Sequence, residues 1–316
     1  MVRKPAMPWI QAVCALAGAG LLAACAPAER APSEPASRVE TGDGVALRFA
    51  VLGDAEPKPV PVFPGVEAAV RDVNAMAETG RIDFVVGVGD LAHDGTSIQY
   101  ENVTPVLQKL TRPFYPIMGN EEHNTTVERF LEYAGRWNAE ITSARYVQDR
   151  GSVVLVYASP DFGRDFDDDG IEWILDQVRA AAPKPVFLIV HAAPVGVYPE
   201  NPEKGVQNPR FAEIVAELNL AAVISGDLHM DMDRVVHSRQ IGHVQYLHMP
   251  ALERTKIPDE TRHTPMFRVF TVTTGGDVTV DTYQTGVAEP LERLAYSFSL
   301  APRGEPASGS AASEWR

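Results

Sequence analysis

The sequence predicts an α/β protein in which strands and helices alternate along the chain. Two observations lead to this fold class. Apolar runs rich in β-branched residues recur, and five of them stop at a polar residue that can bind a ligand. Between the runs lie segments whose apolar residues follow helical spacing. Since ligands in open α/β sheets bind at the carboxyl ends of strands, the five ends are expected to converge on one rim.

The first apolar run, 47–52, ends at Gly53 and Asp54, and Glu56 follows two residues later. A run of β-formers that stops at such a turn is typical of a buried strand that delivers a carboxylate to the edge of a sheet. The other four runs deliver, in chain order, Asp90, Asn120, His191 and the pair Asp227 and His229.

Helices are expected over 63–79, 97–110, 126–133, 170–182 and 208–218. Two hairpins are expected, one over 142–161 and one over 266–285 with Gly275 and Gly276 at its turn. We treat 45–285 as one domain and 286–316 as a C-terminal extension, expected to be disordered from about residue 301 because that part is rich in Ala, Ser and Gly.

The N-terminus has the pattern of a secretory signal peptide. Arg3 and Lys4 precede a short apolar run, 12–24, and the sequence Leu-Ala-Ala-Cys at 22–25 resembles the lipobox of bacterial lipoproteins. Residues 1–24 are then removed and Cys25 is lipidated; the alternative is an ordinary cleavage site at which Cys25 is merely a small residue. Residues 25–44 form a flexible tether. Because Ala26 follows the cysteine, the periplasmic side of the outer membrane is favoured over the inner membrane.

The charge balance is acidic. The whole chain has a formal net charge of −14, and removal of Arg3 and Lys4 leaves 26 basic against 42 acidic residues, or −16. Such a surface argues against nucleic-acid binding and against adsorption to anionic lipid. Cys14 and Cys25 are the only cysteines, so the mature domain has neither a disulfide framework nor cysteine ligands.

The polar strand ends resemble, in order and in type, those of the calcineurin-like metallophosphoesterases. That family shows Asp-x-His, Gly-Asp, Gly-Asn-His-Asp/Glu, His and Gly-His-x-His; the matching segments here are 53–56, 89–90, 119–122, His191 and 226–229. The resemblance spans roughly residues 46–285. It implies two mixed β-sheets flanked by helices and two divalent metals above the strand ends.

The resemblance also implies the roles of individual residues. Asp90 would bridge two metals. One ion would be completed by Asp54, Glu56 and His229, and the other by Asn120, His191 and Asp227. Metal-activated water would then attack a phosphoester, with Asn120 orienting metal and substrate.

Three expected histidines are replaced, by Glu56, Glu121 and Asp227. Two of these positions are ligand positions, and both replacements keep an oxygen donor. Harder ligands shift the metal preference from zinc or iron towards manganese or magnesium. Four ligand carboxylates leave two dications with about zero net charge, so attraction for phosphate is weakened and occupancy by a single metal becomes possible.

The third replacement affects catalysis. Glu121 stands where the family has a histidine that acts on the leaving group, and a carboxylate repels phosphate unless it is protonated. His123 is therefore a candidate catalytic residue with Asn120 and Glu121, and His93 and His248 are further candidates.

A second acidic cluster, Asp165, Asp167 and Asp169, matches the opening of a calcium loop. The competing interpretation is that Asp168 or Asp169 caps the helix that follows. Three basic residues could meet a substrate phosphate: Lys204, Arg210 and Arg234.

The sequence as a whole predicts a lipid-anchored phosphomono- or diesterase acting on a phosphate-ester small molecule or a phospholipid-like substrate. The main alternative is a catalytically impaired member that serves as a metal-binding or partner-docking lipoprotein. A third hypothesis is a calcium-stabilised structural lipoprotein.

Overall fold

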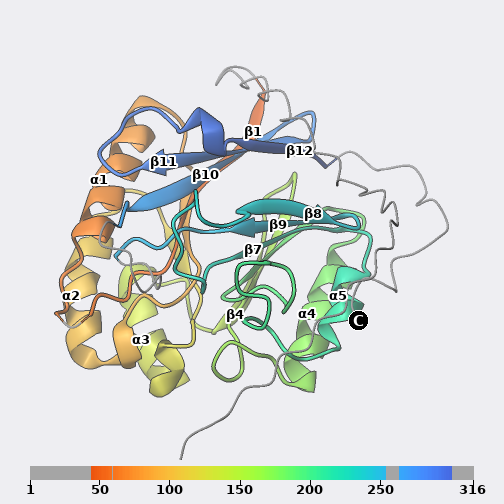
Figure 1. The fold of residues 1–316 in the computed structure, drawn as a ribbon, viewed down its shortest axis with the longest axis horizontal. Coiled ribbons are helices and arrows are strands. Elements are labelled where there is room, and N and C mark those ends of the chain that lie inside the picture. Colours follow the sequence, from red (N-terminus) through yellow and green to blue (C-terminus); the bar gives the residue numbers. More distant parts are fainter. Residues whose placement is uncertain (1–43, 59, 254–262, 301–316) are drawn as a thin grey trace, which may run out of the picture. The chain divides into compact units, whose positions relative to one another are not determined.

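A computed structural model describes residues 44–58, 60–253 and 263–300. It contains two six-stranded mixed sheets with helices against them, which confirms the predicted fold class (Figure 1). The predicted signal peptide, almost all of the tether and the tail from residue 301 lie outside the described residues. Within the described part, no helix combines the length and apolar character needed to cross a membrane.

The first sheet contains β1 (Val45–Leu52), β2 (Phe84–Gly87), β3 (Phe114–Pro116), β10 (Met266–Thr273), β11 (Asp277–Gln284) and β12 (Tyr296–Ser299). Their order is β12-β11-β10-β1-β2-β3. Strands β1, β2 and β3 are parallel, and the β10–β11 hairpin joins antiparallel to β1. Three of the predicted strand ends therefore open on the same edge of this sheet.

The second sheet contains β4 (Arg145–Asp149), β5 (Val154–Ala158), β6 (Val186–Val190), β7 (Leu220–Ser225), β8 (Ser238–Ile241) and β9 (Val244–His248). Their order is β4-β5-β6-β7-β9-β8, with β5, β6, β7 and β9 parallel. The predicted β4–β5 hairpin is confirmed. Strands β6 and β7 deliver the other two predicted strand ends.

Alternating side chains of the central strands build two cores. In β1, Phe49 and Val51 point towards the second sheet, and Ala50 and Leu52 point towards the helices of the first. The Phe49 ring stacks between Phe84 and Phe270, with centroids 5.0 and 4.9 Å away. This packing between the sheets holds the two sets of strand ends together.

Helices cover the outer face of each sheet. The helices are α1 (Pro64–Thr79), α2 (Ser97–Leu107), α3 (Val127–Trp137), α4 (Asp168–Ala181) and α5 (Phe211–Val215). Residues of α1 and α2 pack on the first sheet and those of α4 and α5 on the second; Figure 1 shows the two groups on opposite sides. Helix α5 is much shorter than the predicted 208–218.

Candidate metal centre

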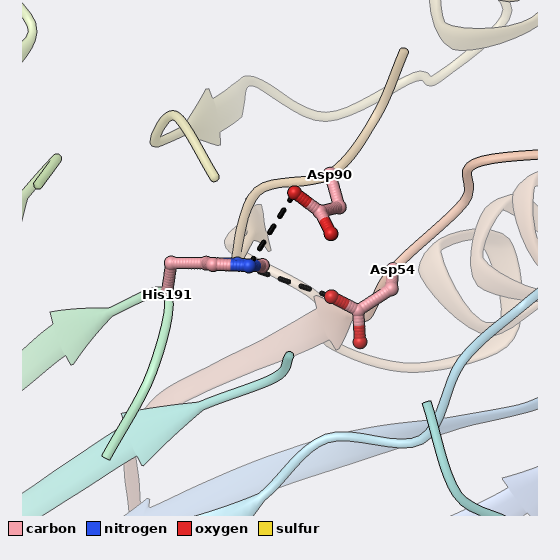
Figure 2. A group of neighbouring side chains, drawn as sticks. All are labelled: Asp54, Asp90 and His191. Carbon is pink, nitrogen blue, oxygen red and sulfur yellow. Dashed lines mark ion pairs between the residues drawn. The ribbon is translucent and has the colours of Figure 1, made fainter. Parts of the chain in front are cut away.

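The predicted ligands meet where the strand ends of the two sheets face each other. Asp54 follows β1, Asp90 follows β2 and His191 follows β6, and all three are buried. Figure 2 shows their side chains pointing towards one another, with His191 Nε2 3.4 Å from Asp90 Oδ1. The ring Nδ1 of His191 donates to the backbone carbonyl of Val88 at 2.8 Å, which leaves Nε2 to face the centre.

Three of the predicted ligands, Asp90, Asp227 and His229, have left-handed backbone conformations. The φ angles of Asp90, Asp227 and His229 are 52°, 69° and 51°. Residues other than glycine rarely adopt positive φ, and such conformations cluster at functional sites. Here they turn the chain sharply after β2 and β7, so that the side chains project into the space between the sheets.

A buried carboxylate, Glu122, ties together the loops after β2 and β3. Its Oε1 accepts from the backbone N–H groups of Leu91 and Ala92 at 2.7 and 2.9 Å. Its Oε2 accepts from those of Gly119 and Asp90 at 2.7 and 3.0 Å. Burial and the nearby Asp90 raise the pKa of Glu122 to about 7, against the opposing effect of these hydrogen bonds. Glu122 thus positions the loop that bears Asp90.

The same two loops approach too closely for a side chain at Gly119. A Cβ there would lie 2.3 Å from Asp90 Oδ1 and 2.8 Å from His191 Cε1. Glycine at this position therefore allows Asp90 and His191 to face one another.

The structure brings together one of the two predicted sets, which we call the Glu56 site: Asp54, Glu56, Asp90 and His229. His229 Nε2 lies 3.3 Å from Asp90, 3.5 Å from Asp54 and 3.5 Å from Glu56. Glu56, Asp90 and His229 offer ligand atoms that all lie within 4.8 Å of one another. Three buried carboxylates around one imidazole fit a divalent cation with a preference for oxygen ligands.

The electrostatics of the centre favour positive charge. Burial alone would raise the pKa of Asp90, but the imidazoles of His191 and His229 hold it well below its usual range. Conversely, burial would lower the pKa of His191, but Asp90 and Asp227 hold it well above its usual range. The same carboxylates, Asp90 and Asp227, would stabilise a bound cation.

The other predicted set, which we call the His191 site, comprises Asp90, Asn120, His191 and Asp227. His191 Nε2 lies 3.3 Å from Asn120 Oδ1 and 3.6 Å from Asp227 Oδ1. Asp227 is also paired with two basic residues that face it from other loops, Arg164 and Lys204. Burial would raise the pKa of Asp227, but His191, Lys204 and Arg164 together hold it well below its usual range.

Glu121 lies beside the Glu56 site and contacts His93 and Lys58. Its Oε2 is 2.6 Å from His93 Nδ1, and its Oε1 is 3.6 Å from Lys58 Nζ. Glu56 Oε2 lies 3.6 Å from His93 Nδ1 and 3.1 Å from Lys58 Nζ. The carboxylate that stands in place of the family histidine is therefore hydrogen-bonded to another histidine.

His123 points away from the ligands. Its Nε2 lies 2.9 Å from the carbonyl oxygen of Pro160, and burial lowers its pKa. Among the residues that the structure describes, His123 belongs to no group that could hold a metal ion. His93 therefore lies nearer to the predicted centre than His123 does.

The calcium-loop prediction finds no support. Asp165 accepts from the backbone N–H groups of Phe166, Gln207 and Asn208, and Asp167 caps α4 by accepting from Gly170 N. The carboxylates are thus used as backbone acceptors, and 165, 167 and 169 form no candidate metal group within the described part of the chain. The cap, Asp167, is one residue before Asp168 and two before Asp169, the two expected caps.

Sequence reasoning missed Arg164 and Lys58 and left the role of Glu122 open. Arg164 lies in the loop between β5 and α4, 63 residues from Asp227, so no local pattern reveals the pair. The available signal was the replacement of an imidazole by Asp227, because an additional buried carboxylate requires a compensating cation. Of the basic candidates, Lys204 reaches the centre, whereas Arg210 pairs with Glu172 and Glu213 on the surface of α4 and α5.

Comparisons with known proteins give a distant relative and a solved structure of similar fold. A protein from Arcobacter nitrofigilis named "Probable glycerophosphodiester phosphodiesterase GpdQ" is 23% identical over 156 residues, which are 46% of this chain and 56% of that protein. The structure of purple acid phosphatase PPD1 from yellow lupin (Lupinus luteus) seeds superposes with a TM-score of 0.58 at 12% identity, covering 80% of this chain and 53% of that one. The chain thus spans little more than half the length of these two proteins.

The match to the family itself covers more of the chain than the match to the curated relative. The family model described as calcineurin-like phosphoesterase matches residues 47–231, which include every ligand of the Glu56 and His191 sites. This match extends over more than half of the sequence and agrees with the sheet topology and the strand-end ligands. The chain therefore belongs to the calcineurin-like phosphoesterase family.

Proposed function

We propose that the protein is a metal-dependent phosphoesterase that hydrolyses phosphodiesters or phosphomonoesters at the Glu56 site. The observation that carries this proposal is the convergence of Glu56, Asp90 and His229, three buried ligands from three loops, within 4.8 Å. Lys58 offers one positive charge to Glu56, but three buried carboxylates, Asp54, Glu56 and Asp90, lie around His229, so the arrangement favours a role in binding a metal. Manganese or magnesium suits these ligands best.

The residues around the ligands have distinct tasks. A divalent ion held by Asp54, Glu56, Asp90 and His229 would supply Lewis-acid activation of water and neutralise charge on the phosphate. Glu122 fixes the loop of Asp90 through its four backbone hydrogen bonds. The low dielectric of this buried region strengthens each electrostatic contact.

His93 is the residue best placed to assist the leaving group. Glu121 lies 2.6 Å from Nδ1 of His93, and Asp94 Oδ2 lies 3.2 Å from its Nε2. The side chain is 25% exposed, so solvent and substrate can reach it. An imidazole held between carboxylates is oriented to pass a proton to a departing alkoxide. Glu121 would then act by orienting His93 rather than by touching the phosphate.

The proposed substrate class rests on the relative from Arcobacter nitrofigilis, and the proposed location rests on the N-terminal sequence. The name of the Arcobacter nitrofigilis relative favours a phosphodiester over a monoester. The lipobox-like sequence at 22–25 supports a lipid-anchored protein on the periplasmic side of a bacterial outer membrane, where phospholipid-like phosphodiesters are within reach. A catalytically impaired, metal-binding lipoprotein is the alternative, favoured by Glu121 in place of the family histidine.

The test is hydrolysis of p-nitrophenyl phosphate and bis(p-nitrophenyl) phosphate by chelator-treated protein supplied in turn with Mn²⁺, Mg²⁺ and Zn²⁺. We expect turnover with Mn²⁺ or Mg²⁺ that Asp90→Asn reduces at least 100-fold. Asp277→Asn, an exposed carboxylate at the start of β11, is the matched control and should retain full activity. Metal binding without turnover in the wild-type protein would refute the enzyme and favour the alternative.

A further inference from the structure

The oxygen donors of the His191 site are already bound by two basic side chains. Arg164 donates from Nε to Asp227 Oδ2 at 3.0 Å and from Nη2 to Asp227 Oδ1 at 3.2 Å. Lys204 Nζ lies 2.8 Å from Asp227 Oδ1 and also donates to the backbone carbonyl of Asp227. We call Arg164 and Lys204 the basic pair.

Arg164 also contacts the second oxygen donor of this site. Its Nη2 lies 2.6 Å from Asn120 Oδ1, so one guanidinium nitrogen contacts both Asn120 Oδ1 and Asp227 Oδ1. A divalent ion bound to the same two oxygens would lie about 2.1 Å from each of them and would compete with this nitrogen for their lone pairs. The oxygens of Asn120 and Asp227 are therefore not open to a second metal while Arg164 holds this position. The remaining buried group that could hold a metal beside His191 consists of Asp54, Asp90 and His191, and it shares two of its three residues with the Glu56 site.

Charge leads to the same conclusion. Glu122 is held by four backbone N–H groups and is left out of the count. The other five buried carboxylates carry five formal negative charges, and one dication with Lys58 and the basic pair supplies five positive charges; the five are Asp54, Glu56, Asp90, Glu121 and Asp227. A second dication would leave two positive charges in excess within this buried region. By contrast, among the residues that the structure describes, only the imidazoles of His191 and His229 lie within ion-pair distance of Asp90.

The basic pair is also accessible to a ligand. The side chains of Arg164 and Lys204 are 34% and 16% exposed, and both line a hollow of about 540 Å³. Their neighbours in its wall include Asn201 and Gln207 and two acidic residues, Asp165 and Glu203. Since Nε and Nη2 of Arg164 donate to Asp227 and Asn120, Nη1 is the guanidinium nitrogen left to donate to a phosphate oxygen.

We infer that the basic pair takes the place of the family's second metal ion, so that the centre holds one divalent cation, at the Glu56 site. Arg164 and Lys204 neutralise Asp227 and present positive charge to the phosphate of the substrate. This inference rests on the proposed function for the identity of the substrate, but its statement about metal number stands on the geometry alone.

Metal stoichiometry tests the inference without an activity measurement. The full-length protein is saturated with MnCl₂, freed of unbound metal by gel filtration, and analysed by mass spectrometry of the metal and by electron paramagnetic resonance. We expect one Mn²⁺ per chain with the six-line spectrum of an isolated ion. The triple variant Arg164→Ala, Lys204→Ala, Asp227→His should bind two ions with an exchange-coupled spectrum, whereas Arg210→Ala, the surface control, should bind one.

Two single variants keep the test decisive if the triple variant fails to fold. His229→Gln should lose the bound ion, and His191→Gln should retain it. Two ions in the wild-type protein, or one ion in a folded triple variant, would overturn the inference and leave the proposed function standing. An ion that depends on His191 rather than His229 would overturn both. A wild-type protein that binds no ion would overturn both.

Discussion

At the scale of single residues, Glu122 is the side chain on which the geometry of the centre depends most. Four backbone N–H groups from two loops converge on its buried carboxylate. Glu122→Gln keeps the volume but replaces one acceptor oxygen by an NH₂ group, which leaves two buried donors facing a donor. Each unsatisfied donor costs about 1–3 kcal/mol, so we expect a loss of about 2–5 kcal/mol in the free energy of unfolding.

Urea denaturation of metal-free protein measures this effect. Glu128→Gln, an exposed change in the first turn of α3, is the control and should shift the unfolding free energy by less than about 0.5 kcal/mol. Equal stability of the Glu122 and Glu128 variants would show that Glu122 does not hold the two loops together.

His93 gives a second prediction at this scale. If its imidazole protonates the leaving group, His93→Gln should slow the hydrolysis of alkyl phosphate esters about 100-fold. Hydrolysis of nitrophenyl esters should slow much less, because nitrophenolate leaves without a proton. The comparison of kcat for the two ester types measures this difference. A uniform loss on both would assign His93 a role in binding or folding instead.

At the scale of elements, the loops after β2 and β3 must stay within contact distance for Asp90 to face His191. Gly119→Ala places a Cβ 2.3 Å from Asp90 Oδ1, so one loop must move. We expect Mn²⁺ affinity at least 10-fold weaker by titration calorimetry. Gly135→Ala in α3 is the matched control, since its new Cβ meets no atom closer than 3.9 Å and alanine favours a helix. Unchanged affinity in the Gly119 variant would contradict the close packing.

Strand β12 is an element that sequence reasoning did not find. It lies in the predicted C-terminal extension, pairs with β11, and its Tyr296 and Phe298 pack against the core between the sheets. A chain ending at Ala295 should be less stable than one ending at Leu300 by about 2–4 kcal/mol, from the lost burial of the two rings. Thermal and urea unfolding compare the two chains. Equal stability would mean that β12 adds nothing to the sheet.

At the scale of the whole molecule, two imidazoles lie at the second sheet, His248 buried at the end of β9 and His237 partly buried just before β8. Burial and the buried Arg268 lower the pKa of His248 to about 3 and that of His237 to about 4. Folded-state values below the ordinary 6.5 mean that both groups contribute stability that is present above pH 6.5 and is lost as the pH falls towards 4 and then 3. The molecule should therefore become markedly less stable in acid.

The variant His248→Phe isolates one of these contributions. Between pH 7 and pH 5 its loss of unfolding free energy should be smaller than that of the wild-type protein by about 2 kcal/mol, since each group changes stability by about 1.4 kcal/mol per pH unit below 6.5. Urea denaturation at the two pH values gives the difference. An identical pH dependence would show that His248 titrates normally in the folded protein.

Much of this architecture was predictable from local patterns. Asp54, Asp90 and His191 each follow a short apolar run, and only the carboxyl end of a buried strand explains that arrangement. Strands β8, β9 and β12 were not predicted because they are short segments at or near sheet edges. Strands β8 and β12 also mix polar residues among apolar ones. The role of Arg164 was not predicted because its partners, Asn120 and Asp227, lie 44 and 63 residues away and only the fold brings them together.

Anomalous diffraction from crystals soaked in MnCl₂ tests the account most directly, because it locates the ion among the strand ends. We predict one manganese peak within coordination distance of Glu56, Asp90 and His229, with Arg164 still contacting Asn120 and Asp227. Two peaks of comparable height, or a single peak between Asn120 and His191, would contradict the account.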